Sequence, residues 1–293
     1  MKTRAERIVE YLLLLPALLM ICVFILYPLA ANFGFSFQRF TLGAIERDNV
    51  GWANYRQMLH DEVVRTAIIN NLRYAVISIL VQVVVAHILA ATVLTVLPKK
   101  FASIARSYFF VPVLLSITVV AILFTFILDP GNGLLNSALT GMGLEALARP
   151  WLGDPGTAIF SIISVSQWQS LGYTMLLFIV SMQAIPDELY EAASLEGAGL
   201  WQRYWRITVP QTREMTFVVT VLTVSGAFTV FSEPYIMTGG GPGNSSQVLA
   251  TYMYQQGFFQ NQMGYASALA ILMFLITLIL SIAQSFMFRT GRE

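Results

Sequence analysis

The chain has 293 residues, of which 56% are hydrophobic and only 11% are charged. A soluble domain carries about 25% charged residues, so this composition excludes an ordinary water-soluble domain, and lipid is the expected solvent. The net charge of +1 provides no basic field for binding nucleic acid. A single cysteine, Cys22, and two distant histidines, His60 and His87, exclude an internal disulfide and a multi-cysteine zinc site.

The first apolar stretch follows a charged segment, residues 1–10. Three basic residues, Lys2, Arg4 and Arg7, lie in that segment, and apolar residues then continue to Ala31. This stretch is longer than the 7–15 residues of a signal-peptide core. We therefore expect a first membrane span that is retained.

Charged residues mark where further spans must end, because a span needs about 20 predominantly apolar residues. The gaps between charges predict six helices, at about 11–33, 74–97, 107–128, 157–183, 215–235 and 265–288. Residues 11–293 then form one transmembrane domain. The glycine-rich segment Gly239–Ser246 precedes the sixth helix. It lacks the lysine of a phosphate-binding loop and a preceding strand, which predicts an outer-face turn.

Lysine and arginine set the orientation of membrane proteins, because they are retained on the cytoplasmic side. With the N-terminus inside, eleven basic residues fall on the inner side and six on the outer side. The predicted topology therefore places both termini in the cytoplasm of a bacterium, with the chain in its inner membrane.

The outer segment 39–73 carries five arginines, which is unusual under this rule. Its apolar residues recur at helical spacing: Trp52, Tyr55, Leu59, Val63 and Ala67. This pattern predicts a helix that lies along the outer interface. A loop helix packed on the bundle explains the pattern equally well.

A polar segment between the fourth and fifth spans has the properties of a short helix offered to a partner. Pro186 suits a helix start because its missing N–H would be unbonded there. Asp187 and Glu188 in the first turn complement the helix dipole. Ala192 and Ala193 leave a nearly side-chain-free patch that allows another backbone to approach closely.

Two glycines predict where this short helix ends. Gly197 and Gly199 permit a sharp reversal of the chain, and Pro210 is expected to stop a second short helix before the fifth span. Residues 186–210 thus form a compact acidic loop on the inner side. The simpler alternative is an ordinary surface helix with no partner.

A family resemblance rests on this loop. The pattern is Glu191-Ala192-Ala193, three residues, Gly197, nine residues, Ile207, one residue and Val209-Pro210. It resembles the EAA loop of binding-protein-dependent ABC importer permeases, although that family usually has leucine before the final proline, where this chain has Val209. Other segments resemble the maltose and glycerol-phosphate branch, and in particular the maltose-transporter F subunit: Tyr27-Pro28, Gly51-Trp52-Ala53-Asn54-Tyr55, Trp151-Leu152, Thr238-Gly239-Gly240-Gly241-Pro242 and Gly264-Tyr265-Ala266-Ser267-Ala268.

The resemblance implies an all-α membrane protein with the six transmembrane helices of the type I ABC importer permease fold and a cytoplasmic coupling helix between helices 4 and 5. It also implies a heterodimer with a second permease, an ABC ATPase dimer, and a periplasmic or lipoprotein sugar-binding protein. ATP and magnesium would be bound by the ATPase, and this chain would bind no cofactor. The ATPase-coupling residues would be Glu191, Ala192, Ala193 and Gly197.

Polar residues within spans usually face a cavity or another helix, because they are costly in lipid. In the fourth span, Ser166, Gln169, Ser170 and Tyr173 share one helical face, and amides, hydroxyls and an aromatic ring suit a sugar. The family places part of its solute pocket on this helix. In the fifth span we expect Gly226, Val230 and Glu233 to contribute.

Alternative roles for these polar groups remain open. Serine and glutamine in spans often bond neighbouring helices, and a hydrogen bond between helices is the preferred role for Gln82 and His87. Glu233 can be solvated near the outer end of the fifth span. The predicted spans contain no lysine or arginine. An acidic solute would need cationic partners, so a neutral sugar or polyol is preferred.

Two other protein classes fit the sequence less well. A secondary transporter often has inverted repeats and more spans, and no internal repeat is evident. A membrane enzyme needs clustered titratable groups, which the sequence lacks. Hydrolysis of ATP would belong to another subunit.

Overall fold

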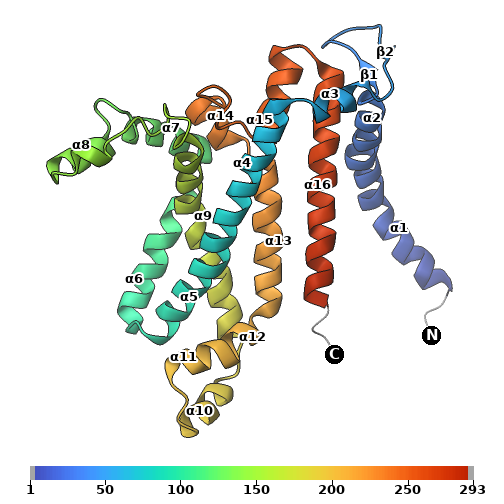
Figure 1. The fold of residues 1–293 in the computed structure, drawn as a ribbon. Coiled ribbons are helices and arrows are strands. Elements are labelled where there is room, and N and C mark those ends of the chain that lie inside the picture. Colours follow the sequence, from blue (N-terminus) through green and yellow to red (C-terminus); the bar gives the residue numbers. More distant parts are fainter. Residues whose placement is uncertain (1–3, 290–293) are drawn as a thin grey trace. The chain divides into compact units, whose positions relative to one another are not determined.

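The computed structural model describes residues 4–289, with side chains placed for residues 13–287. Within these residues the chain is almost entirely helical, and its two short strands, β1 (Gln38–Arg39) and β2 (Asp48–Asn49), pair antiparallel (Figure 1). The chain divides into two compact units. The first contains the residues up to Asp61 together with residues 253–274, and the second contains residues 62–252 and the residues from Leu275 onward.

The first unit begins with one continuous helical stretch. Helix α1 (Arg4–Ile21) runs through a π-helical turn, Cys22–Leu26, into α2 (Tyr27–Phe35). This stretch contains the predicted first span and continues two residues beyond it. After the strands come α3 (Ala53–Leu59), the π-helical turn Gln255–Phe259 and the first part of α16 (Met263–Arg289).

Side-chain hydrogen bonds hold the segment that contains the β-strands against helices of the same unit. The amide nitrogen of Asn54 donates to the carbonyl oxygens of Ser36 at 2.8 Å and Gln38 at 2.9 Å. The Tyr265 hydroxyl donates to the Asp61 carboxylate at 2.7 Å. A Cβ atom at Gly264 would overlap the carbonyl of Gln38, so glycine is needed where α16 touches β1.

The second unit contains the remaining helices. These are α4 (Glu62–Ser78), α5 (Ala86–Thr95), α6 (Lys99–Phe110), α7 (Ile117–Ile127), α8 (Leu134–Gly141), α9 (Ala158–Gln183), α10 (Asp187–Leu195), α11 (Leu200–Arg203), α12 (Val209–Gln211), α13 (Arg213–Thr229), α14 (Ser232–Thr238) and the start of α15 (Leu249–Tyr254). Two π-helical segments, Ile79–Val85 and Tyr204–Thr208, join α4 to α5 and α11 to α12. Two 3-10 turns, Val111–Leu114 and Glu145–Leu147, complete the unit.

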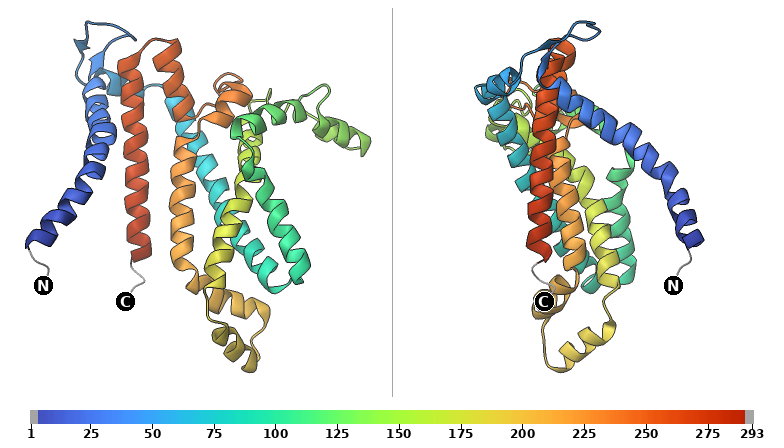
Figure 2. Two further views of the ribbon diagram at one scale, coloured as in Figure 1. Left: turned by 180° about the vertical axis from the view of Figure 1, so that it is seen from behind. Right: turned by 90° about the vertical axis from the view of Figure 1, so that its right-hand side faces the viewer.

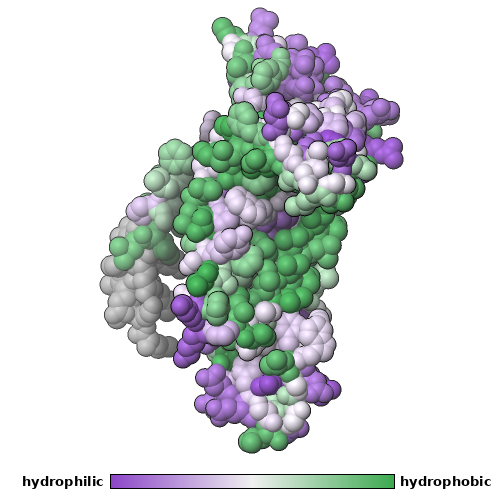
Figure 3. Space-filling view, turned by 90° about the vertical axis from the view of Figure 1, so that its left-hand side faces the viewer, coloured by the Kyte–Doolittle hydropathy of each residue, from purple (hydrophilic) through white to green (hydrophobic). Residues whose placement is uncertain are grey.

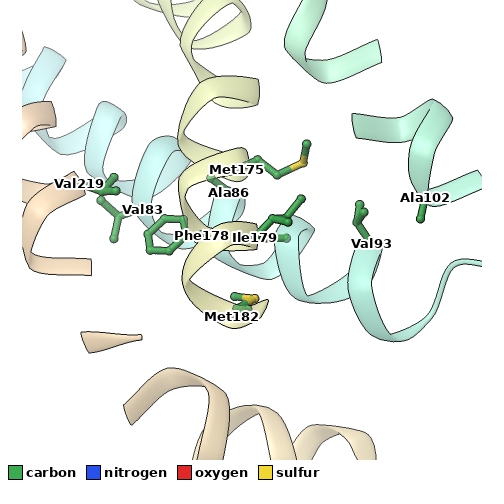
Figure 4. Close-up of a cluster of buried hydrophobic side chains, with 10 residues drawn as sticks. Val83, Ala86, Val93, Ala102, Met175, Phe178, Ile179, Met182 and Val219 are labelled. Carbon is green, nitrogen blue, oxygen red and sulfur yellow. The ribbon is translucent and has the colours of Figure 1, made fainter. Parts of the chain in front are cut away.

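Helix α9 is the centre of the second unit. It packs against α5, α6 and α13, and its buried residues face several directions, as expected for a helix surrounded by others. Figure 4 shows the core that results, in which Phe178 of α9 lies beside Val83 and Val219, while Met175 extends from the other side of the helix. In Figures 1 and 2, α10–α12 lie at one end of α9, and α7 and α14 lie at the other.

Among the described residues, four helical stretches are long and apolar enough to cross a membrane, and a bent pair makes a fifth. The four are Leu13–Phe35, Glu62–Thr95, Arg213–Thr238 and Met263–Met287. The predicted fourth span, 157–183, is α9, which has 26 residues but is not among them because its polar residues lower the mean hydropathy. On the face drawn in Figure 3, apolar residues form a broad middle band.

The third span differs from the single helix predicted at 107–128. Helices α6 and α7 meet at an angle of 97°. The break follows the 3-10 turn that contains Pro112, and it lies where Leu115 and Ser116 take up extended backbone conformations. Proline cannot donate a backbone hydrogen bond, which favours a break at this point.

The second span also differs from its prediction, because it begins at Glu62 and not near residue 74. Arg73 lies within α4 with its side chain directed outward, where its guanidinium donates to the Asn70 side chain at 3.1 Å. A charged residue therefore does not end this helix. The prediction of one helix across residues 52–67 is also wrong, since α3 ends at Leu59 and α4 begins only at Glu62.

Candidate functional site

A cavity of about 380 Å³ lies among α4, α7, α9, α13 and α14 of the second unit. Six residues predicted to bind solute line it: Ser166, Ser170, Tyr173, Gly226, Val230 and Glu233. The structure therefore brings together polar groups from the fourth and fifth predicted spans. Tyr173 is 46% exposed, which leaves the residue available for contact.

Gln169, the seventh predicted residue, does not line the cavity. Its side chain is buried and donates to the Leu115 carbonyl oxygen at 2.8 Å. That carbonyl lies at the bend between α6 and α7, where no helical N–H is available to it. Gln169 lies at the edge of the predicted helical face, and its part in solute binding stays a prediction.

Three further cavity residues come from the second span and were not predicted. Tyr74, Ser78 and Gln82 line the cavity, and they occur at positions i, i+4 and i+8 of one continuous helix. This spacing places polar side chains on a common face. The signal that could have found them was therefore present in the sequence.

A chain of hydrogen bonds joins three helical stretches at one wall of the cavity. Gln82 donates to the Gln167 side chain at 2.8 Å, and Gln167 donates to the Ser78 hydroxyl at 2.9 Å. Thr223 of α13 donates to Gln82 at 3.2 Å. The prediction that Gln82 bonds a neighbouring helix is confirmed, and these bonds fix the cavity wall.

Among the described residues that line the cavity, Glu233 is the only one with a charged side chain. It is buried, with 8% exposure, and the Tyr74 hydroxyl donates to its carboxylate at 3.4 Å. The alternative of a solvated Glu233 is therefore wrong. Helix α13 ends at Thr229, and the extended residue Val230 redirects the chain into α14, which turns Glu233 toward the cavity.

The end of α10 is closed by a Schellman motif. Gly197 has a φ angle of +79°, a conformation that residues with a Cβ rarely adopt. Its N–H donates to the Ser194 carbonyl at 3.0 Å, and the N–H of Ala198 donates to the Ala193 carbonyl at 2.9 Å. These two bonds satisfy the terminal carbonyls and confirm that the helix ends at Gly197.

The surface of α10 is open, because none of its residues is buried. Glu191 and Ala192 are exposed, and Ala193 is half-buried. Leu195, at the last turn, is 91% exposed. A fully exposed leucine beside two alanines gives this helix an apolar surface that a groove on another protein could cover.

Short bonds hold the rest of the loop in one conformation. The Arg203 guanidinium donates to the Ser194 hydroxyl at 2.8 Å, and the Gly199 N–H donates to the Gln202 side chain at 3.1 Å.

Pro210 does not end the second short helix as predicted. Helix α12 includes Pro210, and the break comes at Thr212, just before α13.

Sequence comparisons agree with this architecture. Residues 82–290 match the family described as binding-protein-dependent transport system inner membrane component. The chain is 50% identical over 288 residues to the probable ABC transporter permease protein YurN of Bacillus subtilis, with 98% of each chain covered. It is 32% identical to the arabinooligosaccharides transport system permease protein AraP of the same species, with 95% of this chain and 88% of AraP covered.

A solved structure has the same fold. It is a bacterial alginate ABC transporter in complex with an alginate pentasaccharide-bound periplasmic protein. The TM-score is 0.84 at 23% sequence identity, with 98% of this chain and 96% of that chain covered. From this fold and the match over residues 82–290, the chain belongs to the family of binding-protein-dependent transport system inner membrane components.

Proposed function

We propose that this chain forms half of the translocation pore of an ATP-driven sugar importer in the bacterial cytoplasmic membrane. A second permease forms the other half, an ABC ATPase dimer binds ATP and magnesium, and an external sugar-binding protein delivers the solute. The observation that carries this proposal is α10, an exposed acidic helix in the loop that connects the long helices α9 and α13.

The coupling role of α10 follows from its form. The helix sits in a cleft of the ATPase, with Glu191 on the contact surface and Ala192 and Ala193 allowing close approach. Gly197 fixes the angle at which the chain leaves the helix. Because only three residues separate α9 from α10, movement of α10 is passed to the helix that carries five of the cavity residues.

The chemistry of the cavity supports a neutral sugar as the solute. Its described lining holds hydroxyls, an amide, aromatic rings and one carboxylate, without lysine or arginine. An acidic solute would be repelled by Glu233 and would find no cationic partner there. Among relatives, AraP is named for arabino-oligosaccharides, whereas the structural relative imports an acidic polysaccharide, alginate.

The topology proposed here places both termini and α10 in the cytoplasm. A cysteine at Ala192, in a Cys22→Ser background, tests this placement, because Cys22 is the only native cysteine. We expect a membrane-impermeant maleimide to label Ala192→Cys in inside-out vesicles from cells that lack the ATPase subunit, so that its cleft does not cover α10, and not in intact cells whose outer face is accessible. Labelling of Ala192→Cys from the outer face would overturn the topology.

The solute site is tested by Tyr173→Ala in the complete complex reconstituted in proteoliposomes. Wild-type complex is expected to import a labelled neutral arabino-oligosaccharide when ATP is supplied, with little competition from alginate pentasaccharide. Loss of the Tyr173 ring removes a stacking surface from the cavity. We expect the half-saturating solute concentration to rise about tenfold or more, which corresponds to roughly 1.4 kcal/mol.

Tyr108→Ala is the matched control, since Tyr108 is 74% exposed on α6 and lies outside the cavity lining. It should leave both uptake and competition unchanged. If Tyr173→Ala retains the wild-type solute profile, α9 does not contribute to the solute site. If wild-type complex shows no ATP-dependent uptake of any neutral saccharide tried, the sugar assignment fails.

A further inference from the structure

A buried histidine joins the second span to the loop that contains α10. His87 lies on α5 and is 5% exposed. Its Nδ1 is 2.7 Å from the Tyr204 hydroxyl, and its Nε2 is 2.8 Å from the Thr212 hydroxyl. The prediction that His87 makes an inter-helix bond is confirmed, but its partners lie in the coupling loop and at the start of α13.

The hydrogen-bond pattern fixes the protons in this cluster. The Thr212 hydroxyl donates to the Thr208 carbonyl at 2.8 Å, so it must accept a hydrogen bond from Nε2–H of His87. The other ring nitrogen, Nδ1, then accepts from the Tyr204 hydroxyl. Burial raises the pKa of Tyr204, which keeps that hydroxyl protonated. A neutral His87 therefore satisfies every group.

The same cluster reaches α10 itself. The hydroxyls of Tyr190 on α10 and Thr208 lie 2.9 Å apart, and Thr208 is bonded in turn to Thr212. The imidazole also packs against the rings of Phe178 on α9 at 4.8 Å and Tyr204 at 5.4 Å between centroids. Side chains from α5, α9 and the loop thus meet at His87, and Tyr190 connects α10 to this cluster through Thr208.

The second span continues from His87 to the cavity. Helix α5 is joined by the π-helical segment Ile79–Val85 to α4, and Gln82 and Ser78 on this continuous helix line the cavity. A side chain that fixes α5 to the loop therefore connects movement of α10 to a second wall of the cavity, independently of α9.

We infer that His87 is a positioning residue that holds the α10 loop to the second span, so that movement of α10 reorients the cavity wall formed by Ser78 and Gln82. The inference rests on the proposed function, because it assigns to His87 a part in coupling ATP hydrolysis to transport.

The decisive variant is His87→Phe, which keeps an aromatic ring against Phe178 and removes both hydrogen bonds. In the reconstituted complex we expect ATP hydrolysis to persist at half the wild-type rate or more. The number of ATP molecules consumed per saccharide imported should rise at least fivefold. His87→Gln should restore much of the wild-type ratio, because an amide supplies one donor and one acceptor, as neutral imidazole does.

A second measurement reports on the attachment directly. Spin labels at Leu195→Cys and Val96→Cys, in the Cys22→Ser background, report the distance from α10 to the end of α5, and both positions are well exposed. We expect one narrow distance distribution in the labelled complex and a broad one after His87→Phe. Thr92→Val is the matched control, because the Thr92 hydroxyl bonds only the Ile88 carbonyl of its own helix among its described partners.

An unchanged ATP-to-saccharide ratio together with a narrow distribution in His87→Phe would overturn the inference. If His87→Phe fails to assemble, Tyr204→Phe is the variant to test, because it removes one hydrogen bond and keeps the imidazole. A wild-type ATP-to-saccharide ratio and a narrow distance distribution in Tyr204→Phe would then contradict the positioning role of His87. If wild-type complex itself shows no ATP-driven uptake, the proposed function fails, and the spin-label distances still test whether His87 holds the loop.

Discussion

Replacing Gly197 with valine is expected to lower ATP-driven saccharide uptake at least tenfold while the amount of inserted chain stays unchanged. Gly197 has a φ angle of +79°, where a β-branched residue is strained by about 1–3 kcal/mol. Relief of that strain breaks the bonds from residues 197 and 198 back to α10, which changes the direction of the helix end. Uptake in proteoliposomes, normalised to permease content by immunoblot, measures the effect.

Gly199 offers a close control for this substitution. It has a φ angle of −70°, and a Cβ atom placed there meets no other atom within 4 Å. Gly199→Ala should therefore transport at the wild-type rate. Wild-type uptake by Gly197→Val would mean that the geometry of the α10 loop does not matter for coupling.

Gly172→Ala should destabilise the chain more than the roughly 1–3 kcal/mol that overpacking usually costs. A Cβ atom at Gly172 would overlap the Phe109 carbonyl, and because this neighbour is backbone, α6 and α9 must move apart to admit it. We expect the melting temperature of the purified permease complex to fall by about 4 °C or more. Fluorescence-detected size exclusion after heating provides the measurement.

The same change at Gly34 should have the opposite sign. Gly34 lies in α2, and a Cβ atom there meets nothing within 4 Å. Alanine is the better helix former by about 1 kcal/mol, so Gly34→Ala should keep or slightly raise the melting temperature. Equal effects of the two substitutions would show that helix propensity, and not the contact with Phe109, controls the result.

Local chemistry made the loop between the fourth and fifth spans predictable. The residues that begin and end α10 act on neighbouring backbone groups, so their effect is predictable from the adjacent sequence. These residues are Pro186, the two acids that follow it and Gly197. The ends of α10 lie where these residues placed them. The face shared by Ser166, Ser170 and Tyr173 was likewise predictable, because helical periodicity alone puts these side chains together.

The departures from prediction arose in two different ways. Arg73 was taken as the end of a span, but a long side chain can extend from a helix toward a neighbouring polar group, as it does toward Asn70. The bend between α6 and α7 left the Leu115 carbonyl without a helical donor, and Gln169 supplies one. Asn70 lies three residues before Arg73 on the same helix, whereas no spacing in the sequence marks the contact between Gln169 and Leu115.

Helix α9 also sets the scale of movement that the molecule needs. Its 26 residues form a rod about 39 Å long at a rise of 1.5 Å per residue. A tilt of about 10° around the midpoint displaces each end by roughly 3 Å, comparable to the length of a hydrogen bond. Ser170 lies next to that midpoint, so the same tilt moves the cavity residues Ser166 and Tyr173 by only about 1 Å. A helix that pivots there turns a large displacement at the loop into a small adjustment at the cavity.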